Sequence, residues 1–320
     1  MRRLARWLLP PVLLCAGYAP VSYTHLGLCV MINRRKEAAQ GFLYILPSLV
    51  LILVFSVVPI LMSLYFSFTK YNVLQPPQWT GLDNYIRLFR DPYVRASLKN
   101  TVVFTVITVP LQTAGSLVLA AVIAELFHNK FGNFVKSSLF VPVIASAILV
   151  GTLWFTLLSP RGVVNSIIHA FGLPSVNWLG GKLTSMLSVC IVSVWKNVGY
   201  FLVIYFAGIM DIPRSLYEAA EVDGANAFQR FFKITLPGLS SVTFLVVTLG
   251  TIWSFQVFDL VYTMTGGGPG TSTVTLVLTT YNAAFKEYNM GYASAVAMLM
   301  FVFVLAVSGL QKLLLKGGED

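Results

Sequence analysis

Long apolar runs separated by short polar segments make up most of this chain. Helices of about 20 apolar residues can cross the hydrocarbon core of a bilayer, because they satisfy their backbone hydrogen bonds internally. The pattern therefore predicts an all-α integral membrane protein with about six transmembrane helices. The predicted spans cover residues 41–68, 101–124, 137–158, 186–210, 242–264 and 291–310, and Pro47, Pro59, Pro110 and Pro142 fall within them.

The polar segment between the fourth and fifth runs predicts a short helix-turn-helix hairpin. Asp211 and Pro213 favour a helix start, because proline suits the first helical position and an acid complements the free N–H groups there. Gly224 favours a sharp turn, and a second helix over about 225–235 would end at Pro237. We expect small and aromatic side chains to make this hairpin a docking surface: Ala219, Ala220, Ala225, Ala227, Phe228, Phe231 and Phe232.

Composition supports a membrane location and argues against nucleic-acid binding. Of all residues, 57% are hydrophobic and only 11% are charged, whereas roughly a quarter of a soluble domain is charged. The net charge of +10 is spread over short loops that would face anionic lipid and is not clustered among aromatic residues. Cys15, Cys29 and Cys190 form neither a disulfide framework nor a Cys-x-x-Cys metal motif.

The distribution of Lys and Arg predicts that both termini lie in the cytoplasm, because basic residues are retained on that side. With the N-terminus inside, the inner segments from Arg34 to Lys316 carry ten basic residues, and the longer outer segments carry eight. The basic residues of 69–100 weakly oppose this orientation.

The hairpin carries a dense motif at fixed spacing: Glu218, Ala219 and Ala220, then Asp223, Gly224 and Ala225, then Ile234, Leu236 and Pro237. It resembles the EAA loop of the membrane-spanning subunits of binding-protein-dependent ABC importers, and among these the carbohydrate-uptake permeases of the maltose type. The resemblance covers roughly residues 35–316. It implies a MetI-like ABC permease fold whose cytoplasmic EAA loop, at 211–240, seats on a separate ATPase. The alternative is an ordinary amphipathic hairpin between two membrane helices.

Two outer segments add to the resemblance. Residues 79–101 are similar to the first outer loop of sugar permeases, although a plain solvated connector is an alternative. The glycine-rich stretch 265–270 and residues 281–293 look like the family's loop after the fifth span. The stretch lacks the Lys of a Walker A motif, so its glycines more simply allow a tight turn.

By resemblance, this chain would pair with a second permease subunit as a heterodimer, two ATP-binding cassette subunits, an extracytoplasmic solute-binding protein and the lipid of a bacterial plasma membrane. ATP and Mg²⁺ would bind to the ATPase partner. We expect no cofactor, metal or catalytic site in this chain. His25, His128 and His169 show no paired ligand spacing, and no Gly-x-Ser-x-Gly motif supports a nucleophile.

Polar groups inside the spans mark a candidate solute pathway, because in a membrane they are costly unless they face a cavity or a partner helix. A mixture of aromatic, amide and hydroxyl groups suits a sugar. The resemblance places the solute site on the helices before and after the EAA loop. The candidates are Lys196, Asn197 and Tyr200 in the fourth span, and Gly250, Trp253, Ser254, Gln256 and Asp259 in the fifth.

Other interpretations stay open at this point. Lys196 and Asp259 could form a structural ion pair while Tyr200 and Trp253 pack between helices. Lys196 could instead meet an anionic solute, which would make the protein a glycerol phosphate importer permease. An ion-gradient-driven secondary transporter needs only membrane helices and intramembrane charges, and an intramembrane enzyme would need catalytic pairs that are missing.

The first thirty residues resemble a signal peptide, because Arg2, Arg3 and Arg6 precede an apolar run. The basic residues 34–36 nevertheless argue for a cytoplasmic start, so we expect 1–30 to be an upstream extension, with a cleaved signal or a seventh helix as alternatives. The predicted organisation is this extension, then a first transmembrane helix and outer loop over 31–100, and a permease core over 101–320.

Overall fold

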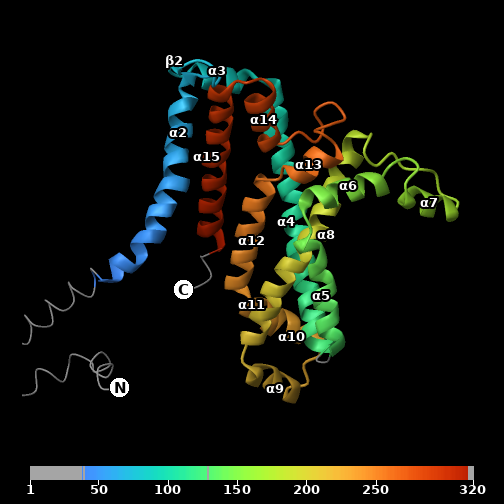
Figure 1. Cartoon of the computed structure of the whole chain (residues 1–320). Coiled ribbons are helices and arrows are strands. Elements are labelled where there is room, and N and C mark those ends of the chain that lie inside the picture. Colours follow the sequence, from blue (N-terminus) through green and yellow to red (C-terminus); the bar gives the residue numbers. More distant parts are fainter. Residues whose placement is uncertain (1–37, 39, 128–129, 316–320) are drawn as a thin grey trace, which may run out of the picture. The chain divides into compact units, whose positions relative to one another are not determined.

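The computed structural model describes residues 38, 40–127 and 130–315, which are mostly helical (Figure 1). The chain divides into two units, residues 1–62 and 63–320. One helix, Gln40–Ser67, crosses this division and contains a π-helical turn, Leu53–Val57, followed by α2 (Val58–Ser67). It is long and apolar enough to cross a membrane, as the first run predicts. The expected extension, residues 1–30, lies outside the described residues.

The second unit is a helical bundle with one small two-stranded sheet. Strand β1 (Thr69–Lys70) pairs antiparallel with β2 (Gln78–Trp79). The first helices are α3 (Asp83–Arg90), α4 (Pro92–Leu126), α5 (Lys130–Ile144), α6 (Ala147–Leu157), α7 (Val163–Ala170) and α8 (Lys182–Asp211). The later ones are α9 (Arg214–Val222), α10 (Ala227–Arg230), a π-helical turn Phe231–Thr235, α11 (Leu236–Gly238), α12 (Ser240–Phe255), α13 (Asp259–Met264), α14 (Leu276–Tyr281), a π-helical turn Asn282–Lys286 and α15 (Met290–Leu315).

Among the described residues, four helices are long and apolar enough to cross a membrane, and six spans result only if each of two bent helix pairs counts as one. The predicted third span is wrong as a straight helix, because Gly132–Ile144 and Ala147–Leu157 meet at 97°. Ser146 has an extended backbone that breaks the helix. The predicted fifth span also breaks, since α12 ends at Phe255 and α13 begins at Asp259.

The segment before α4, residues 79–91, is folded and packed. Helix α4 begins at Pro92, earlier than predicted, because the Asp91 carboxylate accepts a hydrogen bond from Tyr93 N (2.8 Å) and proline suits the first turn. Asp91 also accepts a hydrogen bond from the Tyr292 hydroxyl (2.7 Å). Leu88 and Val94 are buried in one apolar cluster with Tyr292. The alternative of a plain solvated connector is therefore wrong for this segment.

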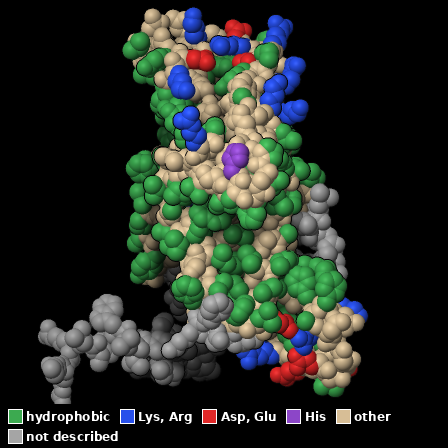
Figure 2. Space-filling model, turned by 90° about the vertical axis from the view of Figure 1, so that its right-hand side faces the viewer, with side chains coloured by type: hydrophobic (Ala, Val, Ile, Leu, Met, Phe, Trp, Pro, Cys, Tyr) green, Lys and Arg blue, Asp and Glu red, His purple; other side chains and the backbone are tan. Residues whose placement is uncertain are grey.

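The glycine-rich loop turns tightly as predicted, with φ values of +60°, +94° and +61° at Gly266, Gly267 and Gly270. In the second unit this loop, α3 and α14 lie toward one end of the long helices, and α9 and α10 lie toward the other (Figure 1). On the face in Figure 2, charged side chains gather at the two ends, with a broad hydrophobic band between them. This distribution is typical of a membrane-crossing bundle.

Candidate functional site

The predicted hairpin is present as an elbow, which we define as residues 213–238. Helix α9 ends at Val222, and Gly224 then turns the chain with φ +76°. Gly224 N donates to Glu221 O (3.0 Å), and Ala225 N donates to Ala220 O (2.8 Å), which satisfies carbonyl groups at the end of α9. A Cβ atom at Gly224 would meet nothing within 4 Å. Backbone conformation alone therefore favours glycine at this position.

The helix starts of the elbow differ from the prediction. Asp211 is the last residue of α8, and Pro213 is the cap before α9. The second helix begins at Ala227 because Asn226 and Gln229 form a capping box, in which each side chain bonds the other residue's backbone N–H (2.8 and 2.9 Å). The Asn-x-x-Gln spacing could have revealed this start from sequence.

Pro237 does not end the second helix, which corrects the prediction. The chain stays helical through Pro237 to Gly238, and a π-helical turn, Phe231–Thr235, directly precedes the proline. A π-helical turn widens the backbone where a proline ring would otherwise clash with the preceding turn. The change of direction comes one residue after Gly238, and there Ala227–Gly238 and Ser240–Phe255 meet at 70°.

The predicted docking residues divide into an exposed set and a packed set. Glu218, Ala219, Asp223 and Gly224 are exposed, as is Pro237, whereas Ala220 and Ala225 are partly covered. The predicted aromatic anchor also divides. Phe228 and Phe232 are exposed with ring centroids 4.5 Å apart, whereas Phe231, Ile234 and Leu236 pack against the buried cluster that contains Leu239. One face of the elbow is thus free and the other is anchored to the bundle.

Arg230, one of the ten basic residues counted above for orientation, connects the elbow to α4. The Arg230 guanidinium pairs with Glu221 of α9 and with Glu125 in the last turn of α4. The Tyr217 hydroxyl is 2.9 Å from Thr235 Oγ1 and adds a polar contact between the two arms of the elbow. Glu125 lies 105 positions from Arg230. No local sequence pattern reports a contact of that separation.

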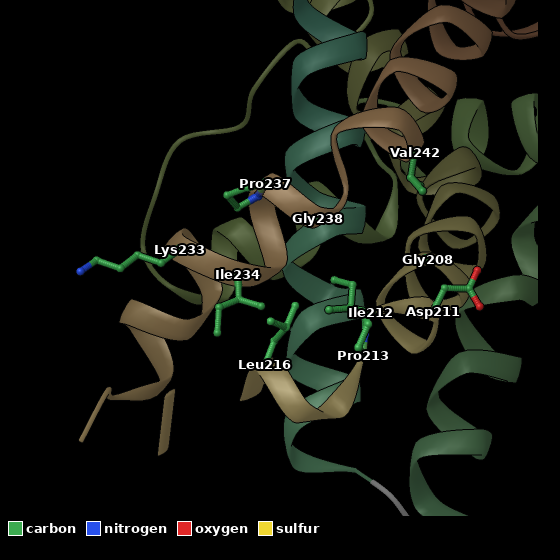
Figure 3. A pocket seen from close by; sticks show the side chains of 10 residues that line it. All are labelled: Gly208, Asp211, Ile212, Pro213, Leu216, Lys233, Ile234, Pro237, Gly238 and Val242. Carbon is green, nitrogen blue, oxygen red and sulfur yellow. The ribbon is translucent and has the colours of Figure 1, made fainter. Parts of the chain in front are cut away.

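A hollow of about 490 Å³ lies where the elbow meets the end of α8. Figure 3 shows Ile212, Leu216 and Ile234 pointing toward one another there, while Asp211 and Lys233 point away. The junction between elbow and membrane helix is thus mainly apolar and lacks a cluster of converging polar groups. It suits packing of the elbow better than binding of a sugar.

A second hollow, of about 210 Å³, contains most of the predicted pathway residues. Its lining includes six of the eight candidates: Lys196, Asn197, Trp253, Ser254, Gln256 and Asp259. Residues 256–258, between α12 and α13, also line it. Irregular backbone at membrane depth is tolerated where it lines a cavity, so the unpredicted break helps to form the hollow.

Tyr200 and Gly250 do not line this hollow, but each supports it. The Tyr200 ring packs on Trp253, with centroids 4.8 Å apart. A Cβ atom at Gly250 would clash with Nε2 of the buried Gln112, so glycine permits α4 to approach α12 closely. Sequence reasoning missed Ser193 and Phe258, which line the hollow, and Gln112, which lies behind Gly250. Gln112 and Ser193 are polar groups within predicted spans, so the same signal could have found them, whereas Phe258 carries no such signal.

The Lys196 ammonium donates to the carbonyl of Val143 (3.4 Å). Within the part of the chain that the structure describes, Lys196 and Asp259 line the same hollow without a direct ion pair. The structure thus places the two charges at one hollow, and a structural pairing between them stays an alternative to a role in the solute pathway. The described residues also contain no group of three or more metal-ligating side chains.

A protein-family match spans both the elbow and the second hollow. Residues 33–317 match the family of binding-protein-dependent transport system inner membrane components. The chain belongs to this family. As a family member it is an integral inner-membrane transport component, which confirms the resemblance drawn from the EAA motif. The matched residues include both the elbow and the second hollow.

Several relatives of this transport component match almost end to end. The probable ABC transporter permease protein YurN of Bacillus subtilis (strain 168) is 36% identical over 91% of this chain and 100% of its own length. The trehalose/maltose transport system permease protein MalF of Thermococcus litoralis is 34% identical over 85% of this chain and 92% of its own. The lactose transport system permease protein LacF of Rhizobium radiobacter is 34% identical over 87% and 94%.

A solved structure shares the fold. The crystal structure of a bacterial ABC transporter involved in the import of the acidic polysaccharide alginate superposes with a TM-score of 0.80 at 23% identity, and covers 91% of this chain and 99% of that chain. The predicted all-α permease fold is therefore confirmed.

Proposed function

We propose that this protein is the permease subunit of an ATP-driven importer that moves a carbohydrate across the bacterial plasma membrane. The elbow carries the proposal. Its exposed face presents Glu218, Gly224 and Phe228 at one end of the bundle, and its other face is fixed to α4 and α8. An elbow that is exposed on one face and packed against the bundle on the other suits docking to a separate ATPase subunit.

The partners follow from this reading. A second permease subunit would complete the pathway, two ATP-binding cassette subunits would grip the two elbows from the cytoplasm, and an extracytoplasmic binding protein would deliver the solute. Both termini would then lie in the cytoplasm, on the side of the elbow. ATP and Mg²⁺ would bind to the ATPase subunits, and this chain would perform no chemistry itself.

Transport would proceed by alternating access. Closure of the ATPase pair on ATP would bring the elbows together and turn the cavity between the two permeases outward by rigid-body motion. Hydrolysis would reverse the motion and open the cavity inward. The second hollow is the part of this cavity that the present chain contributes.

The hollow supports a carbohydrate as the solute. Trp253 offers an aromatic face for the apolar C–H surface of a sugar, while Asn197, Ser254 and Gln256 offer groups for its hydroxyls. Relatives named for trehalose/maltose and lactose transport support the same class. Lys196 in the lining favours a second candidate, a solute with an anionic group such as glycerol phosphate.

The test is to purify the assembled complex with its binding protein and to measure ATP hydrolysis with a panel of oligosaccharides and with glycerol 3-phosphate. We expect an oligosaccharide to stimulate hydrolysis and to be taken up by proteoliposomes on addition of ATP. Stimulation by glycerol 3-phosphate alone would support the second candidate. A chain that purifies without any ATPase, or uptake that follows an ion gradient without ATP, would contradict the proposal.

A further inference from the structure

Arg230 joins three segments that are separate in sequence. It lies at the end of α10 and pairs with Glu221 in α9 and with Glu125 at the end of α4. Its side chain is 16% exposed, whereas those of Glu125 and Glu221 are 41% and 62% exposed. The Glu221 pair closes the elbow on itself, and the Glu125 pair connects the elbow to a membrane helix.

Helix α4 leads from that connection to the second hollow. Between Glu125 and Thr108 the chain is helical throughout, with Pro110 accommodated inside the helix, and 17 residues of helix cover about 26 Å. Thr108 Oγ1 is 3.1 Å from Ser254 Oγ, and Ser254 lines the hollow. Gln112 of α4 lies against Gly250 on the same side of α12. One continuous helix therefore touches the elbow at one end and the hollow wall further along.

The chain's own connections from the elbow to α12 and to α8 are each interrupted by a bend or by non-helical residues. Toward α12, the chain bends by 70° at Leu239. Toward α8, it passes through Ile212 and Pro213, whose backbones are not helical. A joint absorbs part of an applied displacement, whereas a continuous helix transmits it. Helix α4 is thus the one of these three routes without a break.

We propose that Arg230 is a positioning residue that couples the elbow to α4 through Glu125, so that α4 carries displacement of the elbow to the wall of the hollow. This inference rests on the proposed function and adds a residue pair that no part of the EAA motif includes. The role is transmission of motion, because ion pairs with exposed carboxylates add little to stability.

Because the carboxylates of Glu125 and Glu221 are exposed to solvent, the Arg230 ion pairs can be removed by mutation. Removing the Arg230 charge leaves two carboxylates that water can reach, so no buried charge is stranded and the bundle should stay folded. Glu125→Gln is milder still, since its side chain is more exposed than that of Arg230. Glu221→Gln is the matched control, because it removes the pair within the elbow and leaves the pair to α4 in place.

The experiment reports on the hollow without any need to know the solute. In the assembled complex with Cys15, Cys29 and Cys190 replaced by serine, Ala147→Cys places a thiol on the lining of the hollow. Its rate of modification by a membrane-impermeant maleimide is measured with and without ATP, Mg²⁺ and vanadate. ATPase content and basal ATP hydrolysis are measured on the same samples.

We expect ATP and vanadate to change the modification rate of the parent by on the order of fivefold or more, a common size for coupling between distant sites. Arg230→Gln and Glu125→Gln should both remove most of this change at normal ATPase content and basal hydrolysis. The double variant Arg230→Gln/Glu125→Gln should lose no more of the ATP-dependent change than either single variant, because both substitutions remove the same contact. Arg230→Lys should restore part of the change and Glu221→Gln should keep most of it.

The inference is overturned if Glu125→Gln retains the full ATP-dependent change, or if Glu221→Gln loses as much as Glu125→Gln, since Arg230 would then only stabilise the elbow. If Arg230→Gln does not assemble, Glu125→Gln decides alone. Failure of the proposed function looks different: the parent itself, with Arg230 and Glu125 intact, would then bind no ATPase or show no ATP-dependent change.

Discussion

Replacing Gly224 at the turn of the elbow separates backbone strain from loss of side-chain contacts. The residue has φ +76° and open space around its Cβ position, so Gly224→Ala introduces no clash. The left-handed conformation costs a residue with a Cβ about 1–2 kcal/mol, and asparagine adopts it more readily. Proline fixes φ near −65° and removes the N–H that donates to Glu221 O, which costs about 3 kcal/mol or more.

These costs predict a graded loss of docking. A strain of about 1–2 kcal/mol lowers the population of the native turn by a factor of about 5 to 30 relative to competing turns. We therefore expect ATPase co-purification and ATP-dependent uptake to fall in the order Gly224, Gly224→Asn, Gly224→Ala and Gly224→Pro, with uptake abolished in the last. The chain should still reach the membrane in normal amounts, because the turn buries nothing.

Gly172 provides the matched control for this series. It has φ +73°, has no atom within 4 Å of its Cβ position, and donates its N–H to His169 O (2.9 Å) at the end of α7. The same substitutions there impose the same strain away from the elbow. The reasoning is refuted if Gly224→Pro keeps normal uptake, or if Gly172→Pro lowers ATPase co-purification as much as Gly224→Pro does.

Three further predictions follow from exposed and half-buried side chains. Phe228→Ala should lower ATPase co-purification but shift thermal unfolding within about 0.5 kcal/mol, because the residue is 72% exposed. Phe171, which is 79% exposed just after the end of α7, is the control, and an equal loss from Phe171→Ala would argue against docking. Trp253→Ala should raise the sugar concentration that half-stimulates ATP hydrolysis at normal ATPase content, and loss of assembly would instead assign Trp253 to packing. Tyr217→Phe removes a 2.9 Å hydrogen bond to Thr235 and should destabilise by about 0.5–1.5 kcal/mol in thermal unfolding, whereas an unchanged midpoint would show that this bond adds nothing.

Much of the elbow could be predicted from sequence because its determinants are local. Gly224 marks the turn, since few other residues adopt its conformation at low cost, and a helix does begin shortly after it. The prediction that the second helix ends at Pro237 was wrong for a physical reason. A proline breaks a regular α-helix, but the π-helical turn Phe231–Thr235 before it accommodates the ring, and sequence periodicity does not show such a turn.

The breaks within the apolar runs could not be predicted, because hydrophobicity reports burial in lipid or protein and says little about backbone direction. The run 242–264 reads as one helix, although it ends at Phe255 and restarts at Asp259. The pathway candidates were found because polar groups in a span must face something polar. Their neighbour Phe258 was missed because an apolar residue carries no such signal.

The pairing of Arg230 with Glu125 depends on tertiary structure alone. The two residues belong to segments that meet only after α4, α8 and the elbow have packed together. Charge patterning along a helix reveals pairs three or four residues apart, and this pair lies far outside that range. Long-range polar contacts of this kind are therefore the part of the site that needed coordinates.

Photo-crosslinking from the elbow tests the central claim most directly. A photoreactive amino acid replaces Val222, which is almost fully exposed on the elbow, and in a separate sample it replaces Leu74, which is as exposed in the β1–β2 connection. After irradiation in whole cells, the account predicts that Val222 crosslinks to an ATP-binding cassette subunit and that Leu74 does not. A Val222 probe that reaches only periplasmic protein, or no ATPase at all, would contradict it.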